Sequence, residues 1–254
     1  MGRKLGRSSG LTMIFHAICF HTEGLHDDKV WQRLQMALRI LDKKEVKVTF
    51  LIYPFRSIVA GKDITERVKE LAERGHEIGQ HTHFYVGMTV DGPHKRNDLS
   101  DSNVRACIMR DYQWLKACGT EPKGFCAGAW LMTETVLETL AELGFIYDCS
   151  VRLPYYRKNF EMPQLWSEGA RIRTFQGHRI VLLPTSDNLT LFSYLHPERR
   201  RQRVLMMNGM TYQLIYNHDH DLLQWKVWLG LLLHLRIAHE TGTIQQLAEI
   251  CLRE

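Results

Sequence analysis

Short apolar runs alternate with amphipathic segments along most of this chain. The apolar runs predict buried strands, at Leu11–Phe20, Val46–Tyr53, Phe125–Trp130, Phe145–Val151, Arg179–Pro184 and Met210–Asn217. Apolar residues at helical spacing predict helices, at Asp28–Lys43, Ile64–Arg74, Asp101–Ala117, Thr133–Leu143, Leu222–His239 and Thr243–Arg253. A further short strand follows a turn at Gly75 and carries His81 and His83. This alternation predicts βα units and a parallel sheet.

The polar residues with reactive side chains fall just after the predicted strands. In parallel α/β folds the functional site lies at the carboxyl ends of the strands, which would bring these residues together. We therefore predict one barrel-like α/β domain over residues 1–254, with its core at about 11–250. A doubly wound open sheet is the main alternative. Residues 152–178 show no clear period and receive no assignment.

Composition and charge narrow the class of protein only slightly. The chain has 254 residues, of which 44% are hydrophobic and 24% charged, as in ordinary globular proteins. Its net charge of +5 is a mild excess, and the basic run 199–203 lacks the interleaved aromatic residues typical of a nucleic-acid patch. No glycine-rich phosphate loop follows a strand. We expect neither a nucleic-acid partner nor common nucleotide binding.

The spacing of the cysteines and the lengths of the apolar runs indicate the cellular compartment of the protein. The six cysteines include no Cys-x-x-Cys pair, so no zinc ribbon or thioredoxin motif is present. No apolar run has the length of a signal peptide or a membrane span. We therefore expect free thiols in a cytoplasmic protein that does not span a membrane.

Two histidine-containing pairs occur at strand ends. Side chains in a strand repeat with period 2, so His81 and His83 should share one face, where two imidazoles could chelate a divalent metal. A pair of surface histidines is the alternative. By the same period, His21 and Glu23 should share a face at the end of the first strand. The two pairs together would suit a divalent metal, with zinc as the first choice.

The order of elements and several motifs resemble the polysaccharide deacetylase family (carbohydrate esterase family 4, the chitooligosaccharide-deacetylase homology domain). The matching motifs are Val46–Phe50, Arg74–Thr82 with its Gly-His-Glu-Ile-Gly-x-His-Thr string, Pro122–Phe125, Leu143–Ser150 and the strand that ends in His218. The resemblance implies a distorted (β/α) barrel. It also implies metal-dependent removal of an acetyl group from an N-acetylated sugar or glycan.

The resemblance assigns the metal ligands by position. The first motif, usually Phe-Asp-Asp or Phe-Asp-x-Glu, is Phe20-His21-Thr22-Glu23 here, so Glu23 falls on the ligand position. His81 matches the first histidine of the second motif, whose second histidine is replaced by Tyr85. His83 would then supply the missing ligand.

The resemblance also assigns catalytic roles, with two departures. His21 falls where the family has its Asp base, and Cys126 falls where it has the Arg that orients that base. These changes are chemically consistent, because an imidazole base needs no guanidinium partner and a buried unpaired guanidinium would be costly. His218 matches the histidine that protonates the leaving amine, and Asp148 the residue that tethers it or its neighbours.

Three functions are compatible with these assignments. The first is a metal-dependent deacetylase with His21 or Glu23 as base and His218 as acid. The second is a non-catalytic relative that binds carbohydrate through aromatic residues, with candidates at Trp130, Tyr155, Tyr156, Trp166 and Trp225. The third is a hydrolase of a small non-sugar amide. In an enzyme we expect Trp130, Tyr85 and His220 to contact the substrate, with His220 on the same strand face as His218.

Overall fold

A computed structural model describes residues 14–85, 97–151, 171–189, 195, 204–207, 210–238 and 240–253. The strands are Ile14–Thr22 (β1), Thr49–Ile52 (β2), Glu77–Thr82 (β3), Gly124–Ala127 (β4), Tyr147–Asp148 (β5), Arg171–Phe175 (β6), His178–Leu182 (β7), Asp187–Asn188 (β8), Leu205–Met207 (β9), Met210–His218 (β10) and Glu240–Gly242 (β11). The helices are Asp28–Lys43 (α1), Pro54–Val59 (α2), Thr65–Glu73 (α3), Asp101–Ala117 (α4), Glu134–Glu142 (α5), Trp225–Ile237 (α10) and Ile244–Arg253 (α11). Two short 3-10 helices are Gly128–Trp130 (η1) and Asp219–Leu223 (η2).

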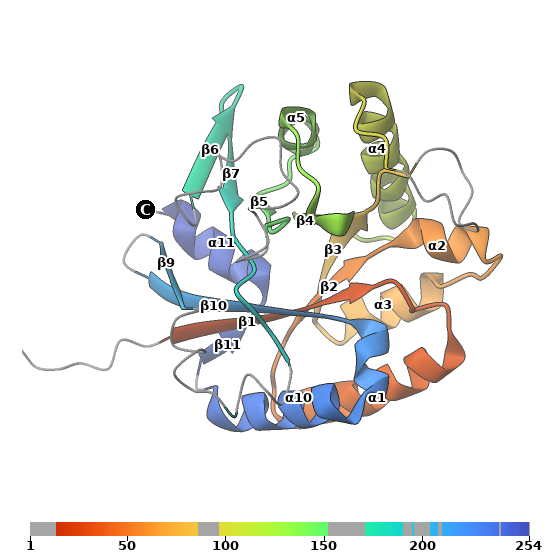
Figure 1. Cartoon of the computed structure of the whole chain (residues 1–254), viewed down its shortest axis with the longest axis vertical. Helices are drawn as coiled ribbons and strands as arrows, with labels where there is room; N and C mark the ends of the chain where they lie inside the picture. Colours follow the sequence, from red (N-terminus) through yellow and green to blue (C-terminus); the bar gives the residue numbers. More distant parts are fainter. Residues whose placement is uncertain are drawn as a thin grey trace, which may run out of the picture.

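The strands form one curled sheet in the order β6-β7-β5-β4-β3-β2-β1-β10-β8 (Figure 1). Neighbours from β7 through to β8 pair in parallel, whereas β6 pairs antiparallel with β7 and β9 antiparallel with β10. Helices between successive parallel strands pass along the outside of the sheet, as βα connections require. The fold is a distorted (β/α) barrel, which confirms the predicted fold class.

Several predicted elements differ in length from those observed. Strand β1 continues to Thr22 and so includes His21. Strand β2 is shorter than the apolar run that predicts it, because the Val46 amide donates to the Leu41 carbonyl and completes the turn that ends α1. The predicted helix from Leu222 divides into η2 and α10, because Gln224 between them has an extended backbone.

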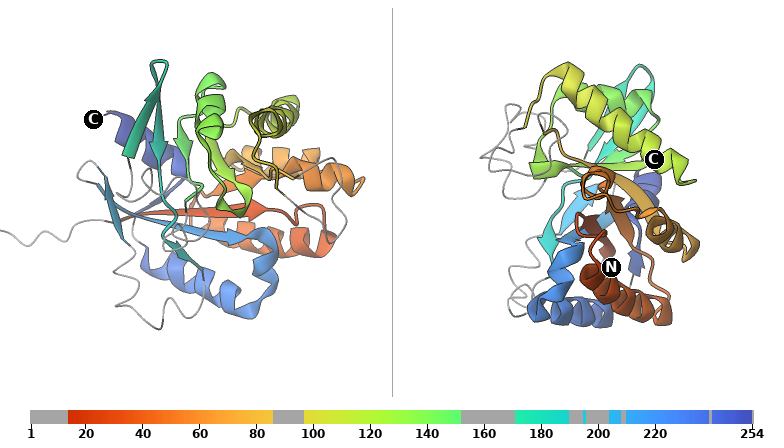
Figure 2. Two further views of the ribbon diagram at one scale, coloured as in Figure 1. Left: turned by 45° about the horizontal axis from the view of Figure 1, so that its top comes forward. Right: turned by 90° about the vertical axis from the view of Figure 1, so that its right-hand side faces the viewer.

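Helices cover the outside of the sheet on two sides (Figure 2). On one side α1, α3 and α10 pack on a buried cluster that includes Phe20 and Phe50. On the other side α4 and α5 pack around Phe125 and Phe145. A third cluster, which includes Tyr147 and four cysteines, joins the strands to α11. In the described part of the chain no helix has the length and apolarity of a membrane span.

Glu77 joins the start of β3 to the C-terminal helix. Its carboxylate accepts hydrogen bonds from Thr49 Oγ1 at 2.6 Å, from the Tyr147 hydroxyl at 2.6 Å and from the Gln245 amide at 2.9 Å. Thr49 Oγ1 in turn accepts from the Ile244 amide at 2.9 Å. These bonds satisfy two of the first amides of α11, which otherwise lack partners within the helix. The Glu of the Gly-His-Glu-Ile-Gly string therefore has a structural role, at the edge of the sheet opposite the strands' carboxyl ends.

Replacing Tyr147 by Phe tests this role of Glu77. Both residues are buried, so loss of the hydroxyl leaves a carboxylate oxygen without a donor, and we expect Tyr147→Phe to lower the free energy of unfolding by about 1–3 kcal/mol. Tyr212→Phe is the matched control, because Tyr212 is equally buried and its hydroxyl has no partner among the described residues. Urea unfolding of both variants measures the difference, and equal losses would contradict the assigned role.

Candidate metal centre

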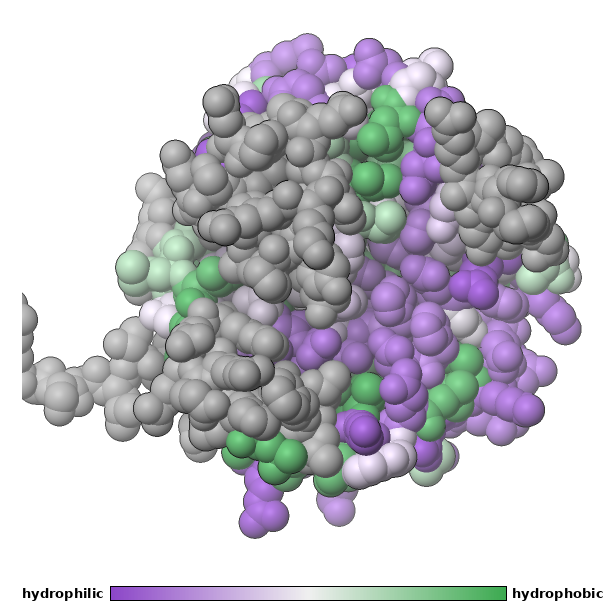
Figure 3. All heavy atoms as spheres, in the orientation of Figure 1, coloured by the Kyte–Doolittle hydropathy of each residue, from purple (hydrophilic) through white to green (hydrophobic). Residues whose placement is uncertain are grey.

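Four parallel strands bring polar side chains to one edge of the barrel. The register pairs His21 of β1 with His218 of β10, and His81 of β3 with Cys126 of β4. Glu23 follows directly after β1. Hydrophilic residues dominate the surface near the end of β10, in the right-hand half of the view (Figure 3). The sheet therefore gathers residues that are far apart in the sequence, as the parallel topology predicts.

One carboxylate oxygen lies at the focus of three imidazoles. Glu23 Oε1 lies 3.1 Å from His83 Nε2, 3.4 Å from His81 Nε2 and 3.5 Å from His218 Nε2. Two ligand atoms bound to one tetrahedral zinc ion at about 2.05 Å would be about 3.3 Å apart. The distances from Glu23 Oε1 to His81 and His83 are thus already close to those between two ligands of one ion.

A backbone contact sets the orientation of His81. Its Nδ1 donates to the Cys126 carbonyl at 2.9 Å, because a carbonyl can only accept. In the neutral ring Nε2 is then unprotonated and its lone pair faces Glu23 Oε1. Metal-bound histidines commonly have this arrangement, in which the second ring nitrogen donates to a carbonyl or carboxylate.

His83 lies between two tyrosine rings, just beyond the end of β3. Its ring centroid is 4.8 Å from that of Tyr53 and 4.9 Å from that of Tyr85, with which it stacks at 18°. Gly128 closes the remaining side, since a Cβ added there would lie 2.2 Å from His83 Cγ. Packing therefore holds the imidazole toward Glu23 without a hydrogen bond to Nδ1 from any described residue.

This donor set fits a divalent metal. In a neutral His81 whose Nδ1 donates to the Cys126 carbonyl, the unprotonated Nε2 faces Glu23 Oε1 at 3.4 Å, so both atoms could bind the same ion. Two neutral imidazoles and one carboxylate are the ligands of several catalytic zinc sites, which leave a fourth position for water. The residues that would hold the ion are Glu23, His81 and His83, whose ligand atoms lie within 4.8 Å of one another.

Glu23 is the main negative charge at this point. Burial alone would raise the pKa of its carboxyl, but hydrogen bonds with His218, His81 and His83 lower that pKa well below its usual range. The carboxyl is therefore ionised across the physiological pH range. Its second oxygen lies 3.4 Å from Arg56 Nη1, which comes from α2 and is partly exposed. Arg56 thus places a cation at the solvent side of the centre.

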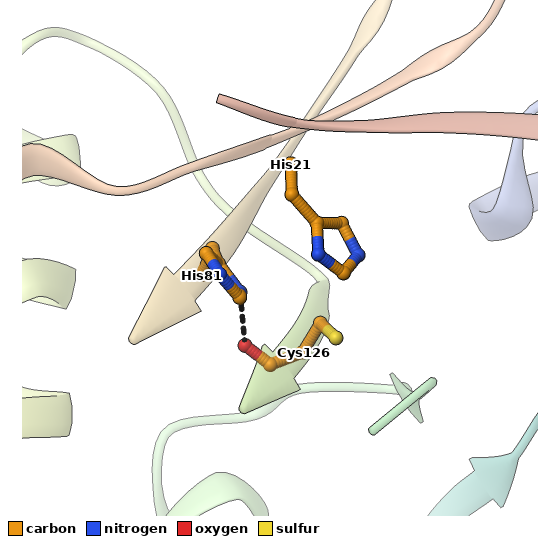
Figure 4. A group of neighbouring side chains, drawn as sticks. All are labelled: His21, His81 and Cys126. Carbon is orange, nitrogen blue, oxygen red and sulfur yellow. Dashed lines mark hydrogen bonds between the residues drawn. The ribbon is translucent and has the colours of Figure 1, made fainter. Parts of the chain in front are cut away.

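His21 and Cys126 lie on the inner side of His81 (Figure 4). The centroid of the His21 ring is 4.5 Å from that of His81 and 5.5 Å from that of His218. Burial and these neighbouring histidines hold the pKa of His21 well below its ordinary value, so the ring is neutral. Its Nε2 is buried and has no hydrogen-bond partner among the described residues.

His218 has a partner that the sequence did not reveal. Its Nδ1 lies 3.5 Å from Asp221 Oδ2, and its amide donates to the same oxygen at 3.0 Å. Burial alone would lower the pKa of His218, but the contacts with Asp221 and Glu23 raise it to about 9. Its imidazole is therefore protonated at neutral pH, as a general acid must be.

The expected position of His220 on the strand is wrong. Strand β10 ends at His218, because Asp221 caps the amide of His218 and starts the 3-10 turn of η2. His220 nevertheless remains beside the centre, with its ring stacked on His218 at 5.0 Å and 18°. It is partly exposed, so it could contact a ligand from the solvent side.

Asp219 fixes the segment that carries Glu23. This carboxylate is fully buried, and both of its oxygens accept from the Gly24 amide, at 2.9 and 3.0 Å. Oδ1 also accepts from the His220 amide at 2.9 Å. Asp219 therefore ties the residue after Glu23 to the residue after His218.

Trp130 forms an aromatic wall of the centre. Its ring centroid is 4.9 Å from that of Tyr216 and 5.4 Å from that of His21. Both Ala129 and Trp130 have positive φ, of 54° and 58°, a backbone conformation that costs about 1–3 kcal/mol for residues other than glycine. Such strain is common at ligand-binding sites. The proposed stacking residues Tyr155, Tyr156 and Trp166 lie outside the described residues.

Asp148 has a different environment from the one that the resemblance implies. It is fully buried, and it accepts hydrogen bonds from the hydroxyl and the amide of Ser150 rather than from His218. Burial raises the pKa of Asp148 to about 7, although the Ser150 hydrogen bonds oppose this effect. In this structure Asp221, not Asp148, contacts His218.

Comparisons with known proteins extend these observations. The polysaccharide deacetylase family model matches residues 25–147. No curated protein matches the sequence. A Mycobacterium smegmatis structure assigned to the polysaccharide deacetylases has 16% sequence identity and a TM-score of 0.65, and the match covers 98% of this chain and 93% of that chain.

Two further solved structures share the fold at similarly low identity. A family 4 acetyl xylan esterase from Clostridium thermocellum, in complex with a cobalt ion, has 17% identity and a TM-score of 0.53, over 93% of this chain and 91% of that chain. A Bacillus anthracis CE4 family pseudoenzyme, BA3943, has 12% identity and a TM-score of 0.54, over 93% of this chain and 66% of that chain. The neighbours thus include both an enzyme and a pseudoenzyme.

The buried carboxyl of Asp148 should affect stability in a pH-dependent way. The native state keeps its proton up to about pH 7, whereas an unfolded Asp loses it near pH 4. Unfolding therefore releases this proton between those values, and we expect rising pH to lower the free energy of unfolding by up to about 1.4 kcal/mol per pH unit. Asp148→Asn should remove this contribution.

Urea unfolding between pH 4.5 and 8 measures the effect as the difference between wild type and variant. Glu73→Gln is the control, because Glu73 is exposed and should leave the wild-type profile unchanged. An Asp148→Asn profile with the wild-type slope would show that the carboxyl is not held protonated.

Proposed function

We propose that this chain, whose residues 25–147 match the polysaccharide deacetylase family model, is a divergent member of that family and a metal-dependent hydrolase that removes an acetyl group from an N-acetylated sugar. The observation that carries the proposal is the convergence of His81 and His83 on one oxygen of Glu23, at 3.4 and 3.1 Å. The cobalt ion in the Clostridium thermocellum esterase supports metal use in this fold. We propose zinc as the ion, because the ligands are two imidazoles and one carboxylate.

A divalent ion at Glu23, His81 and His83 would polarise the acetyl carbonyl and lower the pKa of a bound water. His218 would then serve as the acid, since its imidazole is protonated and its ring lies beside the centre. Asp221 holds the other ring nitrogen and keeps the donor directed inward. The proton would pass from His218 to the leaving amine, which needs it to depart as a neutral group.

His21 is the proposed acceptor of the proton that leaves the attacking water. Its ring is neutral, and its Nε2 has no partner among the described residues, so a lone pair is available. An ionised Glu23 is the alternative acceptor, but its oxygen is needed as a metal ligand. Cys126 at the position where the family has its Arg is consistent with an imidazole in this role, because a neutral base requires no cation to hold it.

Aromatic and cationic groups around the centre are proposed to bind the sugar. Trp130 offers a ring face for stacking, and Tyr85 and His220 cover the outer sides of His83 and His218. Asp148 is proposed to act only indirectly, through the packing of β5 against β4. A carbohydrate is the substrate class that the family supports.

A second candidate function is carbohydrate binding without turnover. His21 and Cys126 replace the Asp and Arg expected by resemblance, and BA3943 is a pseudoenzyme of the same fold. A mutant of BA3943 has restored enzymatic activity. If His21 and Cys126 have abolished activity in this chain, then by analogy a variant that combines His21→Asp with Cys126→Arg should gain it. The introduced Asp and Arg side chains would pair with each other.

Metal content tests the proposed ligands. We expect the purified protein to hold about one equivalent of zinc when dialysed against it, and the His81→Ala, His83→Ala double variant to hold none, because two of the proposed three ligands are gone. His178→Ala on β7 is the control, since His178 contacts the Phe145 carbonyl away from the centre. Elemental analysis gives the ratio, and equal zinc in the double variant would refute the ligand assignment.

Acetate release tests the proposed reaction. We expect zinc-loaded wild type to release acetate from N-acetylglucosamine oligomers, and His218→Gln to keep its zinc but lose about 100-fold or more in kcat, because it lacks the proton donor. His178→Gln, on β7 where His178 contacts the Phe145 carbonyl away from the centre, should retain most of the activity.

Wild type that holds zinc but releases no acetate would favour the binding function. In that case glycan affinity should fall in Trp130→Ala, and acetate should be released by the variant that combines His21→Asp with Cys126→Arg. Neither result is expected if the protein is an active hydrolase and the tested oligomers are not its substrate.

A further inference from the structure

Three buried side chains form a second group with the chemistry of a metal site. One ligand atom each from His21, His81 and Cys126 lies within 4.8 Å of the others. All three residues are at most 2% exposed. Figure 4 shows His21 and Cys126 projecting from β1 and β4 toward the same space beside the His81 ring. The group lies deeper in the barrel than Glu23, whose side chain is 17% exposed.

Two members of this group lack strong hydrogen bonds. His21 Nε2 has no partner among the described residues, although a buried imidazole nitrogen in a folded protein usually has one. Cys126 Sγ lies 3.7 Å from the Ala127 carbonyl and 3.7 Å from the Cys149 carbonyl, and a thiol is a weak donor. A ligand that coordinates both atoms would satisfy them together.

The ligand types distinguish this group from the one around Glu23. Sulfur is a soft ligand that selects thiophilic ions, whereas a carboxylate suits harder ions. A nitrogen and a sulfur bound to one zinc ion would lie about 3.6 Å apart and two nitrogens about 3.3 Å apart, so ligand atoms within 4.8 Å of one another need to approach by about 1.5 Å at most.

We propose that His21, His81 and Cys126 form an inner site for a thiophilic divalent ion, beside the outer site of Glu23, His81 and His83. The inference rests on the proposed metal centre, because His81 belongs to both groups. On binding, a sulfur–metal bond replaces the sulfur–hydrogen bond of Cys126, and the proton leaves to solvent. No oxidant or reductant is required.

The shared histidine has a functional consequence. An ion held at the inner site occupies His81, so the outer site keeps only Glu23 and His83. The inner ion also occupies His21, the proposed proton acceptor. A thiophilic ion would therefore withdraw two groups from the hydrolytic centre, and the identity of the metal would decide whether the centre is available.

Cadmium binding to the full chain tests this proposal, because a cadmium–thiolate bond produces an ultraviolet charge-transfer band and a bond to oxygen or nitrogen does not. Equilibrium dialysis measures bound cadmium independently of that band. We expect wild type to bind cadmium and to show the band. Cys126→Ser should lose the band while still binding cadmium through the outer site.

Cys149→Ser is the matched control, since Cys149 is also fully buried next to Cys126 but lies outside the group. It should keep the band, and its near-ultraviolet circular dichroism, with that of Cys126→Ser, verifies folding. In His21→Ala the band should develop only at higher cadmium concentrations than in wild type, because one proposed ligand is gone.

The outcomes separate this inference from the proposed function. Cadmium bound to wild type without a thiolate band overturns the inner site and leaves the outer one intact. A band unchanged in Cys126→Ser also overturns it, because another cysteine would then be the ligand. No bound cadmium or zinc in wild type overturns the proposed metal centre and the inner site together. If Cys126→Ser fails to fold, His21→Ala decides the matter, because a band that develops at the same cadmium concentration without His21 would overturn the inner site.

Discussion

The parallel pairing of β1 with β10 is the constraint on which the candidate centre depends. Eight residue pairs, from Ile14 with Thr211 to His21 with His218, set the two strands in register. A shift of one residue would turn His21 and Glu23 to the opposite face of the sheet, since side chains alternate along a strand. Asp219 reinforces the register by binding the Gly24 amide beyond the strand ends. The positions of acid, base and carboxylate therefore follow from backbone pairing more than from the side chains themselves.

Electrostatics then determines what these positions can do. Glu23 is ionised because three imidazoles surround it, and His218 is protonated because two carboxylates face it. His21 lies within the same cluster but contacts no carboxylate as closely, and burial keeps it neutral. His21 and His218, within one small volume, thus have different protonation states, which a base and an acid require.

Much of this arrangement could be predicted from the sequence. Apolar runs identified the strands. The two-residue period of a strand placed His21 with Glu23 and His81 with His83, and the strand-end rule brought the two pairs together. Asp221 was missed because its role arises from a 3-10 turn, in which i and i+3 meet, rather than from the strand period. Arg56 was missed because α2 is a single short helix begun by Pro54, with no amphipathic pattern to reveal it. The tether expected at Asp148 depended on resemblance alone, and its surroundings in this chain are set by Ser150 instead.

The pairing of β1 with β10 also constrains how the chain reaches its native state. Strand β1 is almost entirely buried, yet its principal partner follows it by almost 200 residues. During synthesis at about 5–20 residues per second, the apolar surface of β1 would await that partner for roughly 10–40 seconds. Such distant contacts slow folding and leave strand edges open to association with other chains. The geometry that brings His21 and His218 together therefore leaves one edge of β1 unpaired until nearly the whole chain has been made.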